Sequence, residues 1–171
     1  MSYNHKADWY YEGNISRTLV NHFIKKGFTV LKDNSDNIKE RGVDIIIKNS
    51  TSYIIMEVKG YPTRFHTKGI NKGKPKVTKP ELQAKQWFNE VIMTTLLHYN
   101  KFRDEPNLKL AIGLPKFETY EKLVNNIEDY FSDNKLEFKV YFVDENSKVE
   151  EKNLKKIKKP AHNSSLAKWR V

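Results

Sequence analysis

The chain has 171 residues and no cysteine, and its 31 Lys and Arg against 21 Asp and Glu give a formal net charge of +10. The missing cysteines exclude disulfides and thiolate metal sites, and the length suits one domain with a proper hydrophobic core. The five histidines show no zinc-ligand spacing, and no glycine-rich phosphate loop links a strand to a helix. The excess of cations therefore favours a polyanionic partner.

The first predicted element is an amphipathic helix over residues 11–26. Ile15, Leu19 and Phe23 recur at helical spacing and form its apolar stripe. Glu12 lies on the extension of that stripe, one turn ahead of it, so we expect its carboxylate to reach inward. The alternative is an acid that only complements the helix dipole at an N-terminus.

A hairpin is predicted next, after a short strand over residues 28–32. Two apolar, β-branched runs cover residues 43–48 and 53–59 and are joined by a polar turn. If the turn is centred between residues 50 and 51, the antiparallel register places Asp44 opposite Glu57. Directly opposed side chains lie roughly 5 Å apart, so two carboxylates would face each other across the strands.

A lysine joins this pair of acids. Lys59 follows Glu57 by two residues, so both side chains project from the same face of the strand. Opposed like charges are destabilising unless a positive charge lies between them, which predicts a site for a divalent cation. The alternative is a surface hairpin with a cross-strand Glu–Lys pair.

Such a site suits the hydrolysis of a phosphodiester. Mg²⁺ takes one or two carboxylates and keeps several waters, and it supplies a hydroxide near neutral pH. Asp44 and Glu57 suit the ligand role, and the carbonyl of Val58 would add a third oxygen. Lys59 would orient or deprotonate the attacking water, or stabilise the charge of the transition state. The sequence leaves these roles of Lys59 open.

A basic connection follows the hairpin and has no acidic residue between Val58 and Pro80. These cations would neutralise phosphates beside the site and give salt-dependent affinity that is largely independent of base sequence. The alternative is a lysine-rich loop that only confers solubility. The candidate nucleic-acid contacts are Arg64, Lys68, Lys72, Lys74, Lys76 and Lys79.

The second predicted helix covers residues 81–99 and places Gln83 and Trp87 on one face, at a spacing of i and i+4. The amide of Gln83 would hydrogen-bond a phosphate or a metal-bound water. The alternative for Gln83 is a polar residue at a helix start, and Trp87 is expected in the core.

The remaining pattern predicts a strand over 108–113, a helix over 116–132 and a strand over 137–143. We expect a folded domain over residues 1–145 and a basic, partly irregular tail over 146–171. That tail would act as a nucleic-acid arm or as a docking peptide anchored by Leu166 and Trp169.

Asp44, followed at a distance by Glu57-Val58-Lys59, resembles the D…(E/D)-x-K signature of the PD-(D/E)XK nuclease superfamily. That group includes restriction enzymes, Holliday-junction resolvases and RecB-like exonucleases. Val43 stands where the proline of the motif's name would be. The resemblance implies an α/β fold with a restriction-endonuclease-like core, a central mixed β-sheet flanked by helices in the order αβββαβαβ.

Two further residues extend this resemblance. Glu12 matches a glutamate in the first helix of resolvase-like and RecB-like nucleases, where it helps to hold the metal. Gln83 and Trp87 resemble the Q-x-x-x-Y element of RecB-like nucleases, with Trp in place of Tyr. The implied catalytic set is Glu12, Asp44, Glu57, Lys59 and Gln83, and the implied metal ligands are Glu12, Asp44, Glu57 and Val58.

The expected function is that of a Mg²⁺-dependent deoxyribonuclease, an endonuclease, in which Mn²⁺ substitutes for Mg²⁺. DNA is the expected partner ahead of RNA, and a homodimer or a partner protein is compatible with the chain. The alternative is a catalytically silent nucleic-acid-binding protein, or a partner-dependent subunit, on the same fold. No apolar run long enough for a bilayer and no signal-peptide pattern is seen, so we expect a cytoplasmic, nucleoid-associated protein without membrane contact.

Overall fold

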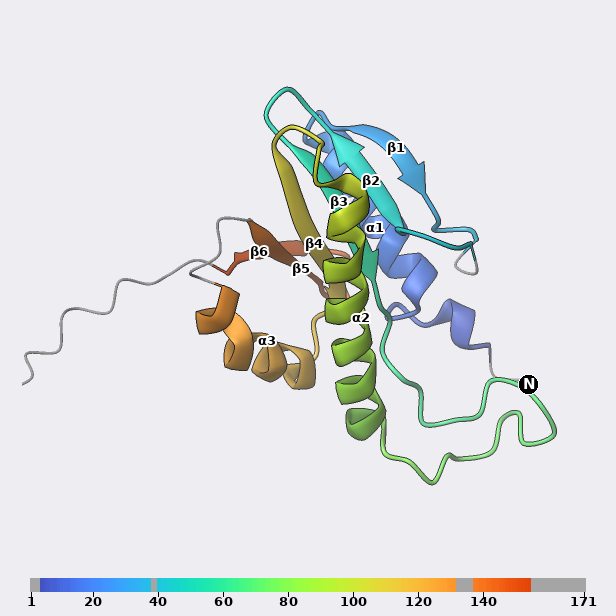
Figure 1. Ribbon diagram of the computed structural model, residues 1–171. Coiled ribbons are helices and arrows are strands. Elements are labelled where there is room, and N and C mark those ends of the chain that lie inside the picture. Colours follow the sequence, from blue (N-terminus) through green and yellow to red (C-terminus); the bar gives the residue numbers. More distant parts are fainter. Residues whose placement is uncertain (1–3, 38–39, 132–136, 155–171) are drawn as a thin grey trace, which may run out of the picture.

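A six-stranded mixed β-sheet forms the centre of the structure, a computed structural model that describes residues 4–37, 40–131 and 137–154 (Figure 1). The strands lie side by side in chain order, from β1 to β6. The pairs β3–β4 and β4–β5 are parallel, and the other pairs are antiparallel. The strands are β1 (Thr29–Asp33), β2 (Ile45–Lys48), β3 (Tyr53–Val58), β4 (Leu108–Pro115), β5 (Phe138–Val143) and β6 (Val149–Asn153).

Three helices cover the two faces of this sheet, after a short 3-10 turn, η1 (His5–Ala7). One buried cluster lies between the sheet and α1 (Glu12–Lys25). A second cluster lies between the opposite face and both α2 (Pro80–Phe102) and α3 (Glu118–Phe131). The α/β class and the predicted mixed sheet flanked by helices are thus confirmed. No helix of the described residues is long and apolar enough to cross a membrane.

The alternation of side chains along β3 decides which face carries the candidate site. Ile54, Met56 and Val58 belong to the cluster beside α1, whereas Ile55 belongs to the cluster beside α2 and α3. Successive side chains of a strand point to opposite faces, so Glu57 shares the face of Ile55. The carboxylate therefore projects toward the layer that contains α2.

The predicted hairpin register is confirmed. Ile45 pairs with Met56 and Lys48 pairs with Tyr53, so the next pair beyond the ladder joins Asp44 and Glu57. The strand β2 begins at Ile45, two residues later than predicted. Asp44 consequently lies just outside the regular ladder, where its side chain can fold over the end of β3.

The strand β6 was not predicted from the sequence, which places this segment in the tail. It pairs antiparallel with β5 and forms an edge of the sheet. Leu154, which follows it, is 4% exposed and packs in the core beside α2 and α3. Residues 155–171, with the predicted anchors Leu166 and Trp169 and most of the tail's lysines, lie outside the described residues.

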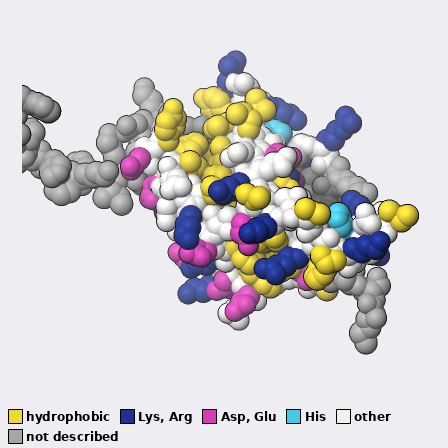
Figure 2. Space-filling model, turned by 90° about the horizontal axis from the view of Figure 1, so that it is seen from below, with side chains coloured by type: hydrophobic (Ala, Val, Ile, Leu, Met, Phe, Trp, Pro, Cys, Tyr) yellow, Lys and Arg dark blue, Asp and Glu magenta, His cyan; other side chains and the backbone are white. Residues whose placement is uncertain are grey.

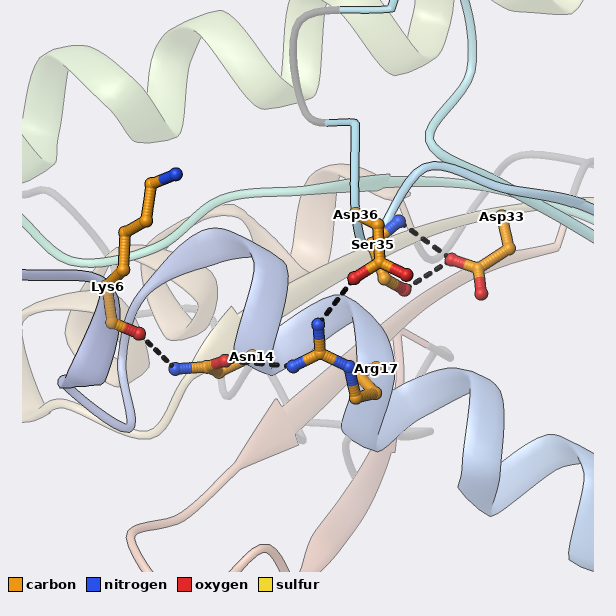
Figure 3. Close-up of polar contacts among 6 residues, drawn as sticks. All are labelled: Lys6, Asn14, Arg17, Asp33, Ser35 and Asp36. Atoms are coloured by element: carbon orange, nitrogen blue, oxygen red, sulfur yellow. Dashed lines mark hydrogen bonds and ion pairs between the residues drawn. The ribbon is translucent and has the colours of Figure 1, made fainter.

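A polar network fixes the start of α1 (Figure 3). The guanidinium of Arg17 donates to Asp36 at 2.7 Å and to Asn14 at 3.1 Å. The amide of Asn14 in turn donates to the carbonyl of Lys6 at 2.9 Å. The first turn of α1 is thereby held between η1 and the loop that follows β1.

Gly13 allows this loop to approach the helix closely. A Cβ atom at Gly13 would lie 2.7 Å from the carbonyl oxygen of Ser35, a distance at which the backbone has to shift. Ser35 is held in turn by the carboxylate of Asp33, which accepts from its backbone N–H at 2.8 Å and from its hydroxyl. The position of the neighbouring Glu12 therefore depends on backbone packing that only glycine permits.

Candidate active site

The structure brings Asp44 and Glu57 together at the end of the hairpin. Oδ2 of Asp44 accepts the backbone N–H of Val58 at 2.8 Å. The two carboxyl groups also share a side-chain hydrogen bond. Since only a protonated carboxyl can donate, this contact requires a proton on one of two acids that would otherwise repel each other.

Burial favours that shared proton. Glu57 is only 7% exposed, and burial, followed by the charge of Asp44, raises its pKa to about 8. Burial also raises the pKa of Asp44, although the N–H of Val58 and the charge of Lys59 lower it. Near neutral pH the pair therefore carries less negative charge than two ionised carboxylates would.

One oxygen of Glu57 has no hydrogen-bond partner in the described residues. Nε2 of His98, from α2, lies 3.1 Å from this Oε1 atom, but the ring is not aligned for a hydrogen bond, and Nε2 is likewise unpartnered. Burial lowers the pKa of His98, so its ring is neutral and does not balance the acid. A buried acceptor without a partner is costly, and it marks a point where a cation or donor would be stabilised.

Lys59 supplies the positive charge at the site. Its backbone N–H donates to the carbonyl of Gly113 at 3.0 Å, which continues the pairing of β3 with β4. Its Nζ lies 3.9 Å from Oε1 of Glu90, a half-exposed and therefore weak ion pair. Burial dominates the raised pKa values of Asp44 and Glu57, and the charge of Lys59 opposes it in both.

Glu12 reaches the same group from the other side of the sheet. Burial raises its pKa to about 7, while the charge of Lys59 and the backbone N–H of Gly60 lower it and the charge of Asp44 raises it. The predicted inward orientation of Glu12 is thus observed. A Cβ atom at Gly60 would lie 2.8 Å from the backbone nitrogen of Glu12, so a glycine is needed where β3 leaves the sheet.

One face of α2 runs along the site. Its residues at positions 83, 87, 90, 94 and 98 span about 80° of the helix circumference. Gln83 contacts the basic connection, Glu90 contacts Lys59 and His98 contacts Glu57. Glu90 and His98 were not predicted as site residues, although their place on the face of Gln83 was a signal that helical spacing offered.

Gln83 and Trp87 line a cavity. Oε1 of Gln83 accepts from Nζ of Lys76 at 3.1 Å. Trp87 was expected in the core, but it belongs to neither buried cluster and borders a cavity of about 260 Å³ that also contacts Glu12. The expectation for Trp87 was wrong because the segment before α1 and the basic connection leave a space beside it.

The basic connection forms an arm, which we define as residues 64–79. Its two limbs are joined by backbone hydrogen bonds from Lys76 to Arg64 and from His66 to Lys74 and by a bridge between Phe65 and Pro75. Five of the six predicted nucleic-acid contacts are exposed: Arg64, Lys68, Lys72, Lys74 and Lys79. Lys76 is half-buried, and burial lowers its pKa.

A large hollow lies beside this arm, away from the carboxylates of Asp44 and Glu57. It measures about 1070 Å³ and is lined by Arg64, Lys76, Lys79 and Lys85, with Glu81 at the start of α2. Seen from below, Lys and Arg side chains are spread over the surface among hydrophobic and acidic ones (Figure 2). The cations therefore do not form one continuous patch on this face.

The donor set suits a hard cation, although no three His, Asp or Glu side chains of the described residues already stand in a metal-binding arrangement. The carboxyl groups of Asp44 and Glu57 are instead hydrogen-bonded to each other, which requires a proton on one of them. Loss of the proton would free carboxylate oxygens, and Oε1 of Glu57 is already unpartnered. Val58 contacts Asp44 through its N–H, so a ligand role for its carbonyl stays a prediction.

Comparisons of the chain with protein family models, with curated proteins and with solved structures give no match.

Proposed function

We propose that this protein is a divalent-metal-dependent nuclease that hydrolyses DNA phosphodiester bonds with a restriction-endonuclease-like core. The observation that carries the proposal is the buried pair of Asp44 and Glu57, with one unpartnered carboxylate oxygen, beside Lys59. Three such groups at the end of an apolar hairpin have no evident use in stability, because burying them costs free energy.

The pair would hold Mg²⁺ or Mn²⁺ through Asp44 and Glu57, with Glu12 assisting. When bound, such an ion polarises a phosphoryl oxygen and lowers the pKa of a bound water. The ion would also displace the proton between the acids, since metal ligands have to be ionised. This explains why two acids are kept in a place where burial disfavours both charges.

Lys59 would act on the reacting groups themselves. It projects from the same face as Glu57, and its charge reaches Asp44, Glu57 and Glu12. An ammonium so placed can orient the attacking water and offset charge that develops on the phosphate. Glu90 would restrain its side chain through the 3.9 Å contact.

The arm would bind the polymer. The arm comes shortly after β3 in the chain, and it contains exposed lysines but no Asp or Glu. Contacts of this kind hold phosphates regardless of base sequence and weaken with salt. The choice of DNA over RNA follows from the resemblance to nucleases that cut DNA, and both polymers belong in the test.

A second candidate is a nucleic-acid-binding protein that does not cut, alone or as a partner-dependent subunit. The hydrogen bonds of Asp44 with the backbone N–H of Val58 and with Glu57 favour it, because they stabilise the Asp44 carboxyl group without a metal. The two candidates differ in whether a metal binds and in whether phosphodiesters break.

A cleavage panel tests the proposal. End-labelled linear, nicked, branched and single-stranded DNA, together with single-stranded RNA, would be incubated with the purified chain and Mg²⁺ or Mn²⁺. We expect metal-dependent cleavage of at least one DNA by the wild type, and none by Asp44→Asn or Glu57→Gln. No cleavage of any DNA by the wild type, or equal cleavage by the two variants, would refute it.

A further inference from the structure

The cavity beside Trp87 is continuous with the candidate active site. It lies between the segment that precedes α1, the chain that leaves β3, and the first two turns of α2. Glu12 belongs to its wall and also lies within electrostatic reach of Asp44 and Lys59. A group held in this cavity would therefore sit next to whatever phosphate the site engages.

The size of the cavity limits its occupant. At about 260 Å³ it falls below the range of roughly 300–1,000 Å³ that is typical of pockets for drug-sized ligands. It is more enclosed than the hollow beside the arm, and its walls include the aromatic side chains of Tyr11, Tyr61 and Trp87. A small, flat, aromatic group fits such a space.

Trp87 is the aromatic wall that is free to stack. Tyr61 already stacks on Phe117 at a centroid distance of 4.0 Å, and the ring of Tyr11 meets that of His5 edge-on at 5.3 Å. Trp87, by contrast, makes no ring contact or hydrogen bond with any described residue, although it is half-buried. A half-buried indole without ring contacts leaves part of its apolar surface uncovered unless another flat group packs against it.

Gln83 adds a polar group to the same wall, one helical turn before Trp87. Its Oε1 accepts from Lys76, and within the described residues its amide NH₂ has no partner. An amide can pair with the edge of a base, and Lys76 fixes its orientation by occupying the oxygen. Stacking on one side and an amide at the edge are the means by which enzymes hold an unstacked base.

We propose that this cavity receives one nucleobase, unstacked from its neighbours, of the strand that the site engages, with Trp87 as its stacking surface and Gln83 at its edge. The inference rests on the proposed function and narrows its substrate. The strand has to be single-stranded or locally open at the point of cutting. The exposed cations of the arm would hold the phosphates on either side.

Abasic oligonucleotides test the inference without any cleavage. The full chain carrying Asp44→Asn, in EDTA, is titrated with a single-stranded 12-mer and with a series in which one abasic residue moves along the strand. An abasic residue keeps the phosphates and removes only one base. We expect one or two positions at which its affinity falls by about 5- to 150-fold, the range for loss of one stacked base.

Variants of the cavity identify where that base sits. Adding Trp87→Ala should lower the affinity for the intact strand to the abasic level and remove the dependence on position. Gln83→Ala should weaken that dependence in part. Trp9→Phe is the matched control, because Trp9 stacks on Phe117 and does not line the cavity, and it should retain the full dependence.

Equal affinity for all abasic strands, or a dependence on position that survives Trp87→Ala, would overturn the inference. A failure to bind single-stranded DNA would overturn it as well. Cleavage by the wild type is scored separately, so a base-dependent strand binder that never cuts would refute the nuclease and support the pocket. Cleavage by the wild type without any dependence of binding on the abasic position would support the nuclease and refute the base-binding cavity.

Discussion

The hydroxyl of Tyr120 donates a hydrogen bond of 2.9 Å to the carbonyl oxygen of Gly60. Tyr120 is fully buried in α3, and Gly60 is the second residue after β3, so the bond fixes the chain where it leaves that strand. On the other side of Gly60 lie the carbonyl of Tyr10 and the nitrogen of Glu12. The position of Glu12 relative to Lys59 is therefore set by packing around one glycine.

Gly60→Ala should impair cleavage by displacing Glu12. Its Cβ would lie 2.7 Å from the carbonyl oxygen of Tyr10, so the backbone has to move. We expect a loss of about 1–3 kcal/mol in stability, as for other overpacked sites, and a loss of about 10²-fold in cleavage rate. Urea unfolding and a DNA cleavage assay measure the two effects.

Gly27→Ala is the matched control for this variant. Gly27 has a φ of 80° and open space around its α-carbon, so alanine there costs about 1–2 kcal/mol by backbone strain alone. It should leave cleavage unchanged under conditions where the protein is folded. If both variants lost cleavage in proportion to stability, the proposed role of Gly60 would be wrong.

Much of this arrangement could be predicted from local pattern. The pairing of Asp44 with Glu57 followed from the period of two along strands and a turn centred between residues 50 and 51. The face shared by Gln83 and Trp87 followed from helical spacing. Both depend only on residues close together in the chain.

Other features depend on contacts that no local pattern contains. The cavity beside Trp87 exists because three separate segments meet there, so its half-buried indole looked like a core residue in the sequence. The strand β6 carries Glu150, Glu151 and Lys152, and such charges are common on edge strands but resemble a solvated tail. His98 meets Glu57 only because α2 packs across β3.

The free energy of unfolding of the metal-free chain should fall as pH rises. Glu12 and Glu57 have pKa values raised to about 7 and about 8 from an ordinary 4.5. Between pH 4.5 and about 8 the unfolded chain has released protons that the folded chain still holds. The free energy of unfolding therefore falls by at most about 1.4 kcal/mol per pH unit for each group. Above about pH 8 these two groups cause no further decrease.

Glu57→Gln isolates the contribution of Glu57 to the pH dependence of the free energy of unfolding. The variant should unfold with a shallower pH dependence than the wild type and should be the more stable of the two at pH 8, in EDTA. Urea unfolding at pH 5, 6, 7 and 8 measures this, with the exposed Glu145→Gln as a control. A pH dependence identical to that of the wild type would show that burial of Glu57 is not the cause.

Lys59→Ala should lower the cleavage rate by about 10²- to 10⁴-fold, the usual contribution of a group that acts on a proton or on transition-state charge. Because the variant keeps Asp44 and Glu57 and the exposed arm, its melting temperature and its affinity for DNA should change little. Lys122→Ala, an exposed lysine of α3, is the control. Undiminished cleavage by Lys59→Ala would reject its assignment.

Removing two cations from the arm should weaken DNA binding and its salt dependence together. With Lys68→Ala and Lys72→Ala combined, the slope of log affinity against log salt should decrease by about 1.8 if each lysine neutralises one duplex phosphate. Lys25→Ala with Lys26→Ala, at the end of α1, removes the same charge and should leave the slope nearly unchanged. Equal effects of the two pairs would show that net charge alone governs binding.

Calorimetric titration of Mn²⁺ into the wild type and Asp44→Asn, in the absence of DNA, tests the central claim most directly. The claim is that Asp44 and Glu57 together hold a divalent cation. We predict saturable binding to the wild type, with release of protons that grows as pH falls from 8 to 6.5, and no such binding to Asp44→Asn. An equal binding isotherm for both proteins, or no binding to the wild type, would contradict it.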